Sequence, residues 1–359
     1  MAVHFHALKI KRLTHETSDA VSIEFDVPDA LRSEFEFEQG QNITIKKLID
    51  GEEIRRSYSI CSAPYENKLT IAVKQIACGK FSNYALQELK AGDELDILPP
   101  TGKFNTRLDA GNKKNYLAIA AGSGITPIIS IIKATLKAEP ESNFTLVFGN
   151  RGRHSILFFE ALEGLKNKYI NRFNLVHILS REATDTPVNS GRIDEAKLKE
   201  LSQFIAIAKM DEYFICGPEA MIFCAKDFLT AEGVALQKIH FELFTTPGQT
   251  KSVARNENLK NKDEGPTSQI TVKLDGRSFD FTLGYNGASL LDAALQQGAD
   301  LPFACKGGVC CTCKAKLLSG QVKMDVNWGL EQEEIEQGYI LTCQSHPITE
   351  KLVVDFDIK

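Results

Sequence analysis

The chain has 359 residues, of which 43% are hydrophobic and 25% are charged. This is the composition of a globular protein of about two to three domains, and it excludes a disordered chain, a collagen and a coiled coil. The net charge of −5 argues against nucleic-acid binding, and no apolar run approaches the roughly 20 residues of a membrane span. Because residues 1–11 contain no apolar signal core, we expect a cytoplasmic protein that binds neither nucleic acid nor membrane.

Residues 1–110 predict an antiparallel β-barrel domain. Short runs rich in β-branched and aromatic residues are separated by turn signals such as Asp50-Gly51 and Pro99-Pro100, which favours a barrel or a sandwich. The expected strands are residues 5–10, 20–27, 42–46, 55–60, 69–75 and 94–97.

In residues 111–246 strands and helices alternate. We expect strands at residues 116–121, 144–148, 173–179, 212–216 and 238–244. The expected helices are residues 127–138, 156–169, 194–205 and 218–232. This alternation predicts an α/β domain with a parallel sheet covered by helices on both faces.

The polar stretch 247–266, which contains Pro and Gly, is typical of a linker. Beyond it, residues 269–274 and 278–283 alternate around Asp275-Gly276, a strong hairpin signal, and residues 289–297 predict a short helix. The chain from Thr267 onward contains 12 acidic and 8 basic side chains, so it carries most of the net negative charge. We therefore expect residues 267–359 to form a separate α+β domain.

The nine cysteines are an odd number, which excludes complete pairing into disulfides. Four of them have the Cys-x4-Cys-x2-Cys spacing, with a distant fourth cysteine, of a plant-type 2Fe-2S site: Cys305, Cys310, Cys313 and Cys343. Gly307 and Gly308 let the backbone approach such a cluster closely. Four cysteines can also bind zinc, but zinc sites usually use two close pairs, whereas here three cysteines lie in one loop. Cys311 is the spare cysteine of this loop, and we interpret it as a packing residue.

The run from Cys305 to Cys313, together with Leu341-Thr-Cys343, resembles the plant-type ferredoxins. This resemblance implies a β-grasp fold for the C-terminal domain and a cluster that passes one electron at a time. The predicted hairpin and helix of this domain follow the order of that fold.

Two segments of the barrel domain are candidates for a flavin site: Arg56-Ser57-Tyr58-Ser59, and Gly79-Lys80-Phe81-Ser82 at the start of a helical stretch at 81–89. By itself, the first segment can simply be a barrel strand that enters a turn. It resembles, however, the flavin motif of the ferredoxin–NADP reductase superfamily. That resemblance implies that Arg56 contacts the FAD pyrophosphate, that Tyr58 lies along the isoalloxazine and that Ser59 bonds near its N5. The second segment would hold the flavin phosphates with backbone N–H groups and Ser82.

The α/β domain contains a glycine turn between a strand and a helix, Gly122-Ser-Gly124-Ile125-Thr126-Pro127. Its context is the one that nucleotide binding requires, although a tight turn alone explains the glycines. Pro127 replaces the third glycine of the usual dinucleotide motif. This argues against an ordinary dehydrogenase and matches the reductase superfamily.

Two further segments are candidates for the nicotinamide nucleotide. Cys216-Gly217-Pro218 ends a strand where open α/β sheets bind ligands, and the resemblance places this cysteine near the nicotinamide ring; a buried structural cysteine is the alternative. Ser180-Arg181 resembles the pair that holds the 2′-phosphate of NADPH, which favours NADPH over NADH, although a solvated loop arginine is also compatible. Phe244 is either a core residue or a cover for the flavin ring. Ser59 and Cys216 are the predicted catalytic residues.

Taken together, the motifs predict an electron-transfer chain from NAD(P)H through FAD and a 2Fe-2S cluster to an external acceptor, because flavins take electrons in pairs and release them singly. The histidines show no ligand spacing and are interpreted as structural. The acidic run from Glu331 to Glu336 is a solvated helix face or a docking surface for a redox partner.

The whole chain resembles the reductase subunits of phenylacetyl-CoA epoxidases. The matching segments are 51–62, 149–151, 302–310, 324–327 and 343–345. The resemblance implies that the partner is a di-iron oxygenase of aerobic phenylacetate breakdown, with FAD in the first domain. Cys311 departs from this pattern, where a small hydroxyl residue or alanine is expected. The alternatives are the reductase of another oxygenase, hydroxylase or desaturase and, more remotely, a non-enzymatic redox sensor.

Overall fold

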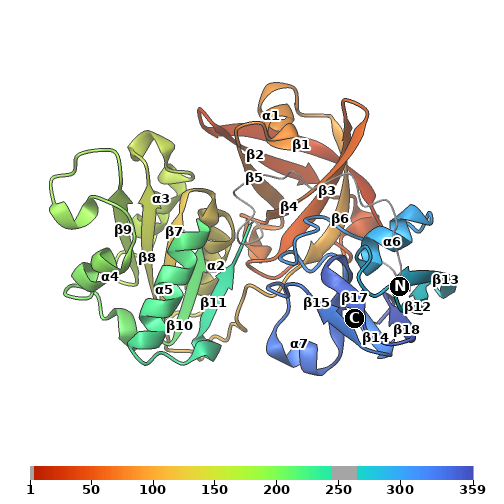
Figure 1. The fold of residues 1–359 in the computed structure, drawn as a ribbon. Coiled ribbons are helices and arrows are strands. Elements are labelled where there is room, and N and C mark those ends of the chain that lie inside the picture. The colour runs from red at the N-terminus through yellow and green to blue at the C-terminus, as the bar shows by residue number, and fades with distance from the viewer. Residues whose placement is uncertain (1–3, 245–264, 359) are drawn as a thin grey trace. The chain divides into compact units, whose positions relative to one another are not determined.

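The structure, a computed structural model, describes residues 4–244 and 265–358 (Figure 1). The described chain divides into two compact units, of which the larger comprises His6–Ile54 and Tyr58–Leu243, and the smaller comprises the remainder. Almost all of the expected linker at 247–266 lies outside the described residues. None of the helices described is both long enough and apolar enough to cross a membrane.

The first sheet is antiparallel and has the strand order β4-β3-β6-β1-β2-β5. Its strands are β1 (His6–Thr17), β2 (Ala20–Asp26), β3 (Asn42–Ile49), β4 (Glu52–Ser59), β5 (Leu69–Lys74) and β6 (Glu94–Thr101). Along β1, Leu8 and Ile10 are buried whereas Ala7 and Lys9 are exposed, as the period of two of a strand requires. Helix α1 (Lys80–Gln87) adds Phe81 to the same core.

Four strands of this sheet, β1, β3, β4 and β6, are longer than expected, and β1 and β6 gain the most residues. β1 continues seven residues beyond Ile10 because its polar second half pairs with β2 in a hairpin. β6 continues through Pro99 and Pro100, which the sequence predicted as a turn. The pairing of β6 with β3 is irregular next to them, and such an irregularity accommodates prolines, which cannot donate to the ladder.

The second sheet of the larger unit is parallel, with the strand order β11-β10-β7-β8-β9. Its strands are β7 (Asn115–Ala121), β8 (Asn143–Asn150), β9 (Phe173–Leu179), β10 (Glu212–Cys216) and β11 (Ile239–Glu242). The helices are α2 (Ile125–Ala138), α3 (Phe159–Lys168), α4 (Glu195–Leu201) and α5 (Glu219–Ala231). The predicted α/β architecture is therefore confirmed.

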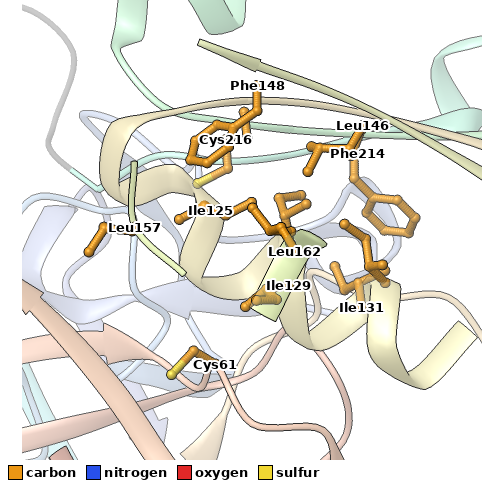
Figure 2. Close-up of a cluster of buried hydrophobic side chains, with 14 of the residues drawn as sticks. Cys61, Ile125, Ile129, Ile131, Leu146, Phe148, Leu157, Leu162, Phe214 and Cys216 are labelled. Carbon is orange, nitrogen blue, oxygen red and sulfur yellow. The ribbon is translucent and has the colours of Figure 1, made fainter. Parts of the chain in front are cut away.

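The core of this domain lies between the sheet and α2. Figure 2 shows Ile125 of α2 near Cys216 of the sheet, with Ile129 farther along the same helix, and all three belong to one buried cluster with Phe148 and Phe214. α2 begins at Ile125, two residues before the expected start, so Pro127 lies inside its first turn. Proline is tolerated there because the first N–H groups of a helix have no partner within the helix.

The two domains of the larger unit are joined through α2. Ser130 Oγ donates to the carbonyl of Ser62, at 2.7 Å and buried, and Lys133 Nζ lies 3.1 Å from the Glu66 carboxylate. Buried polar groups need such partners, so these contacts fix the helix against the barrel residues that follow β4.

The smaller unit contains a five-stranded mixed sheet, β13-β12-β18-β14-β16, and a two-stranded sheet, β15-β17. Its strands are β12 (Thr267–Leu274), β13 (Arg277–Gly284), β14 (Lys314–Ser319), β15 (Val322–Met324), β16 (Tyr339–Leu341), β17 (Ser345–Pro347) and β18 (Lys351–Asp355). Its helices are α6 (Leu290–Gln296) and α7 (Gln332–Glu336). Asp275 and Gly276 both have positive φ angles of 53° and 68°, as the predicted hairpin turn requires. These elements enclose a core of their own.

Candidate nucleotide and iron–sulfur sites

The predicted flavin motif lies on β4. Ser59 is 4% exposed, whereas Arg56 is exposed at the surface and Ser57 and Tyr58 are half-buried. The Tyr58 ring lies 5.5 Å from the ring of Phe81, centroid to centroid. One aromatic pair therefore joins the two segments that the sequence proposed for the flavin.

Hydrogen bonds from nearby side chains stabilise the turn before α1. Ser82 Oγ accepts from the backbone N–H of Ile76 at 3.1 Å, and Asn83 Nδ2 donates to the carbonyl of Gly79 at 2.8 Å. A Cβ at Gly79 would lie 2.5 Å from Ser82 Oγ, which explains the glycine. The Ser82 hydroxyl thus shapes the loop, and Lys80 lies at the first position of the helix with its ammonium paired to Glu52.

The glycine turn after β7 touches the end of β10. Gly122–Gly124 form a single 3-10 turn in which Gly122 has a φ of 55°. A Cβ at Gly124 would lie 2.1 Å from the carbonyl oxygen of Cys216, so no larger residue fits without moving the backbone. Thr126 Oγ1 donates back to the carbonyl of Ser123. The two segments proposed for the nicotinamide nucleotide are therefore in direct contact.

A carboxylate at this edge of the sheet was not predicted from the sequence. Glu242, at the end of β11, accepts a hydrogen bond from Ser59 Oγ at 2.9 Å, and its register partner on β10 is Cys216. The sequence feature that could have indicated Glu242 is its position at the end of a predicted parallel strand, two residues before Phe244. Ser59, Cys216 and Glu242 thus meet where the barrel joins the α/β domain.

Cys216 is fully buried. Burial raises the pKa of its thiol well above the usual value, and the charge of Glu242 raises it further. The side chain is therefore a neutral thiol at pH 7. A neutral buried thiol is a poor nucleophile, so Cys216 can shape the site but cannot act through a thiolate.

The other predicted nucleotide residues lie at the same carboxyl edge. Ser180 donates from its backbone N–H to the carbonyl of Asn150 at 2.9 Å, and the N–H of Arg181 donates to the carbonyl of Arg151 at 2.8 Å. Both arginine side chains are exposed. Gly217 and Pro218 lead into α5, and Phe244, following β11, is 41% exposed and is not a core residue.

The four cysteines proposed as iron ligands come together as two hydrogen-bonded pairs, Cys305 with Cys310 and Cys313 with Cys343. The bond from Cys305 lowers the pKa of Cys310 to about 6 and raises the pKa of Cys305. In the same way, the bond from Cys313 lowers the pKa of Cys343. In each pair, the thiol that accepts the hydrogen bond therefore has the lower pKa. Across residues 4–244 and 265–358, no three His, Cys, Asp or Glu side chains are grouped to hold a single metal ion.

The backbone of the cysteine loop is wound tightly around these sulfurs. Gly307 donates its N–H to Cys305 Sγ at 3.3 Å, and Gly308 has a φ of 75°. Cys311 also has a positive φ, of 54°, and its thiol donates to the carbonyl of Gly329. Two thiol pairs surrounded by N–H donors fit a binuclear iron–sulfur cluster. The close approach of Gly124 to the end of β10 likewise fits a dinucleotide at the sheet edge.

Fold and sites together define a flavin- and iron–sulfur-dependent oxidoreductase that uses a nicotinamide nucleotide. Three family profiles match the chain: an oxidoreductase FAD-binding domain over residues 7–106, an oxidoreductase NAD-binding domain over 118–227 and a 2Fe-2S iron-sulfur cluster binding domain over 272–347. The predicted cofactors FAD, nicotinamide nucleotide and 2Fe-2S are thereby confirmed.

Relatives that match almost the whole chain specify the family. The chain is 46% identical to one component of the 1,2-phenylacetyl-CoA epoxidase of Escherichia coli, over 99% of this chain and 98% of that protein. It is 34% identical to the ferredoxin reductase component of 3-ketosteroid-9-alpha-monooxygenase of Mycobacterium tuberculosis, over 99% and 96%. The structure of phthalate dioxygenase reductase has the same fold, with a TM-score of 0.60, 24% identity and 98% of both chains covered. The chain belongs to the family of oxygenase reductases that includes this component of the epoxidase.

Proposed function

We propose that this chain passes electrons from NADPH through FAD and a 2Fe-2S cluster to the oxygenase component of a phenylacetyl-CoA epoxidase. FAD is assigned to residues 1–110, the nucleotide to 111–246 and the cluster to 267–359. The Ser59–Glu242 hydrogen bond carries the proposal, because it joins the strand assigned to the flavin to the sheet edge assigned to the nicotinamide. A cytoplasmic location is part of the proposal, since none of the nine cysteines forms a disulfide, and unpaired cysteines are typical of reducing compartments.

The residues of the first two domains bind and orient the reactants. A bound flavin accepts a hydride, which is two electrons, and delivers electrons one at a time. Arg56 and the N–H groups at the start of α1 would hold the flavin phosphates, and Tyr58 would cover the ring. Glu242 holds the Ser59 hydroxyl in one orientation through the 2.9 Å bond. The glycine turn at Gly122–Gly124 lies against the carbonyl of Cys216, and this edge of the sheet would hold the nicotinamide.

Cys305, Cys310, Cys313 and Cys343 would supply the four thiolates of the cluster. Their arrangement as two pairs matches two irons with two cysteine ligands each. Cluster assembly would remove the protons of all four thiols.

Reconstitution tests the choice of partner. With the oxygenase component of a phenylacetyl-CoA epoxidase, the reductase should support NADPH-dependent oxygenation of phenylacetyl-CoA. A 3-ketosteroid monooxygenase oxygenase is the comparison, since a reductase of that class shares 34% identity. If the reductase supports turnover by the steroid oxygenase and not by the epoxidase oxygenase, the steroid oxygenase becomes the proposed partner.

Arg181→Ala tests the preference for NADPH. A charge-assisted contact between arginine and the 2′-phosphate is worth about 1.5–3 kcal/mol, so kcat/KM for NADPH should fall about 10- to 100-fold, whereas kcat/KM for NADH should not change. Arg192→Ala removes another exposed arginine of the same segment and is the matched control. An equal fall in kcat/KM for NADPH and NADH would show that Arg181 does not bind the 2′-phosphate.

A further inference from the structure

The side chain of Gln344 lies beside the iron–sulfur ligands, and the cysteine spacing does not account for it. It is 7% exposed, and its Nε2 lies 2.9 Å from the carbonyl oxygen of Lys306, 3.0 Å from that of Cys343 and 3.6 Å from Cys343 Sγ. An amide nitrogen carries only two hydrogens, so these three acceptors share them, and one acceptor is a ligand sulfur.

Gln344 also links the two segments that carry the ligands. Lys306, whose carbonyl it binds, directly follows Cys305 in the loop with three ligands, whereas Gln344 itself directly follows the fourth, distant ligand. The side chain packs against the loop at Gly308, where a Cβ would lie 3.0 Å from Gln344 Cγ. Removal of this amide would leave the partly buried carbonyl of Lys306 without this donor.

We propose that Gln344 is a positioning residue of the iron–sulfur centre, whose amide donates to Cys343 Sγ and to the Lys306 carbonyl and thereby raises the reduction potential of the cluster. The inference rests on the proposed role of Cys343 as a ligand. The physical reason is that reduction adds negative charge to the cluster and its sulfurs. An N–H donor stabilises the more negative state more strongly and so favours reduction.

The test is a reduction potential measured by EPR-monitored redox titration on the full chain with its cofactors. Gln344→Met removes the donor at similar volume, and at a fixed potential the ratio of reduced to oxidised cluster should fall about tenfold, which is about 59 mV for a one-electron couple. Gln344→Glu replaces the donor by a carboxylate, and the ratio should fall further. Gln337→Met, at an exposed glutamine of the same unit, is the control and should leave the potential unchanged. An unaltered potential in Gln344→Met with normal iron content would overturn the inference.

A second measurement uses only the wild-type protein, so its result does not depend on cluster assembly in a variant. In wild-type protein labelled with ¹⁵N only at glutamine side-chain amides, pulsed EPR of the reduced cluster should detect a ¹⁵N coupling. A cluster signal without this coupling would refute the role of Gln344 and leave the proposed function standing. Absence of any cluster signal from the wild type would instead refute the proposed function.

Discussion

Cys305→Ser is expected to abolish the cluster and leave the flavin reaction intact. The variant lacks one of the four thiolates and breaks the Cys305–Cys310 pair, so iron content and the rhombic EPR signal should be lost. Reduction of the flavin by NADPH should keep its wild-type rate, because the core of the smaller unit contains only residues of the C-terminal domain. Reduction of cytochrome c should fall at least about tenfold, since only the flavin remains as a donor.

Cys311→Ser is the matched control, in the same loop. Its thiol donates to the Gly329 carbonyl, and a serine hydroxyl can make the same bond. We expect this variant to keep its iron, its EPR signal and its cytochrome c activity. Loss of the cluster in Cys311→Ser, together with its retention in Cys305→Ser, would show that the four ligands are assigned wrongly.

Glu242→Ala should slow hydride transfer to the flavin about 100-fold, because misplacement of one group at a reacting centre has costs of that order. The change removes the acceptor that orients the Ser59 hydroxyl. Glu242→Gln should slow hydride transfer much less, since the glutamine amide oxygen can still accept the hydrogen bond from Ser59. The measurement is stopped-flow bleaching of the flavin absorbance after mixing with NADPH under anaerobic conditions.

The control for Glu242 is Glu232→Ala, which removes an exposed carboxylate at the end of α5. It should leave flavin reduction unchanged. FAD content should be equal in all of these proteins. If Glu242→Ala reduces the flavin at the wild-type rate, Glu242 does not position the Ser59 hydroxyl for hydride transfer. The Ser59–Glu242 contact would then not mark the reaction centre.

Periodicity and turn chemistry were sufficient for most of the fold. The strands at 173–179 and 212–216 were predicted with their observed bounds, because buried parallel strands are continuous apolar runs between polar turns. The second half of β1 was missed because its many charged residues carry no strand signal, and pairing with β2 supplies what local sequence does not. Pro99 and Pro100 were misread as a turn because a local rule cannot foresee an irregular ladder.

The sites were predictable where one short segment carries the chemistry. The cysteine spacing and the strand–glycine–helix turn are of this kind. Glu242 and Gln344 were missed because their importance comes from partners far away in sequence, Ser59 and Lys306. Nothing in the residues around a glutamate or a glutamine indicates such a contact.

The central claim is that one polypeptide carries its electron carriers in series. Rapid mixing of the anaerobic wild-type protein with NADPH tests it most directly, with flavin absorbance followed in the flow cell and the cluster followed by EPR after freeze-quenching. We predict that the flavin is bleached first and that the rhombic signal then grows at its expense. A cluster signal that precedes flavin reduction, or that never appears although the flavin is reduced and iron is bound, would contradict the account.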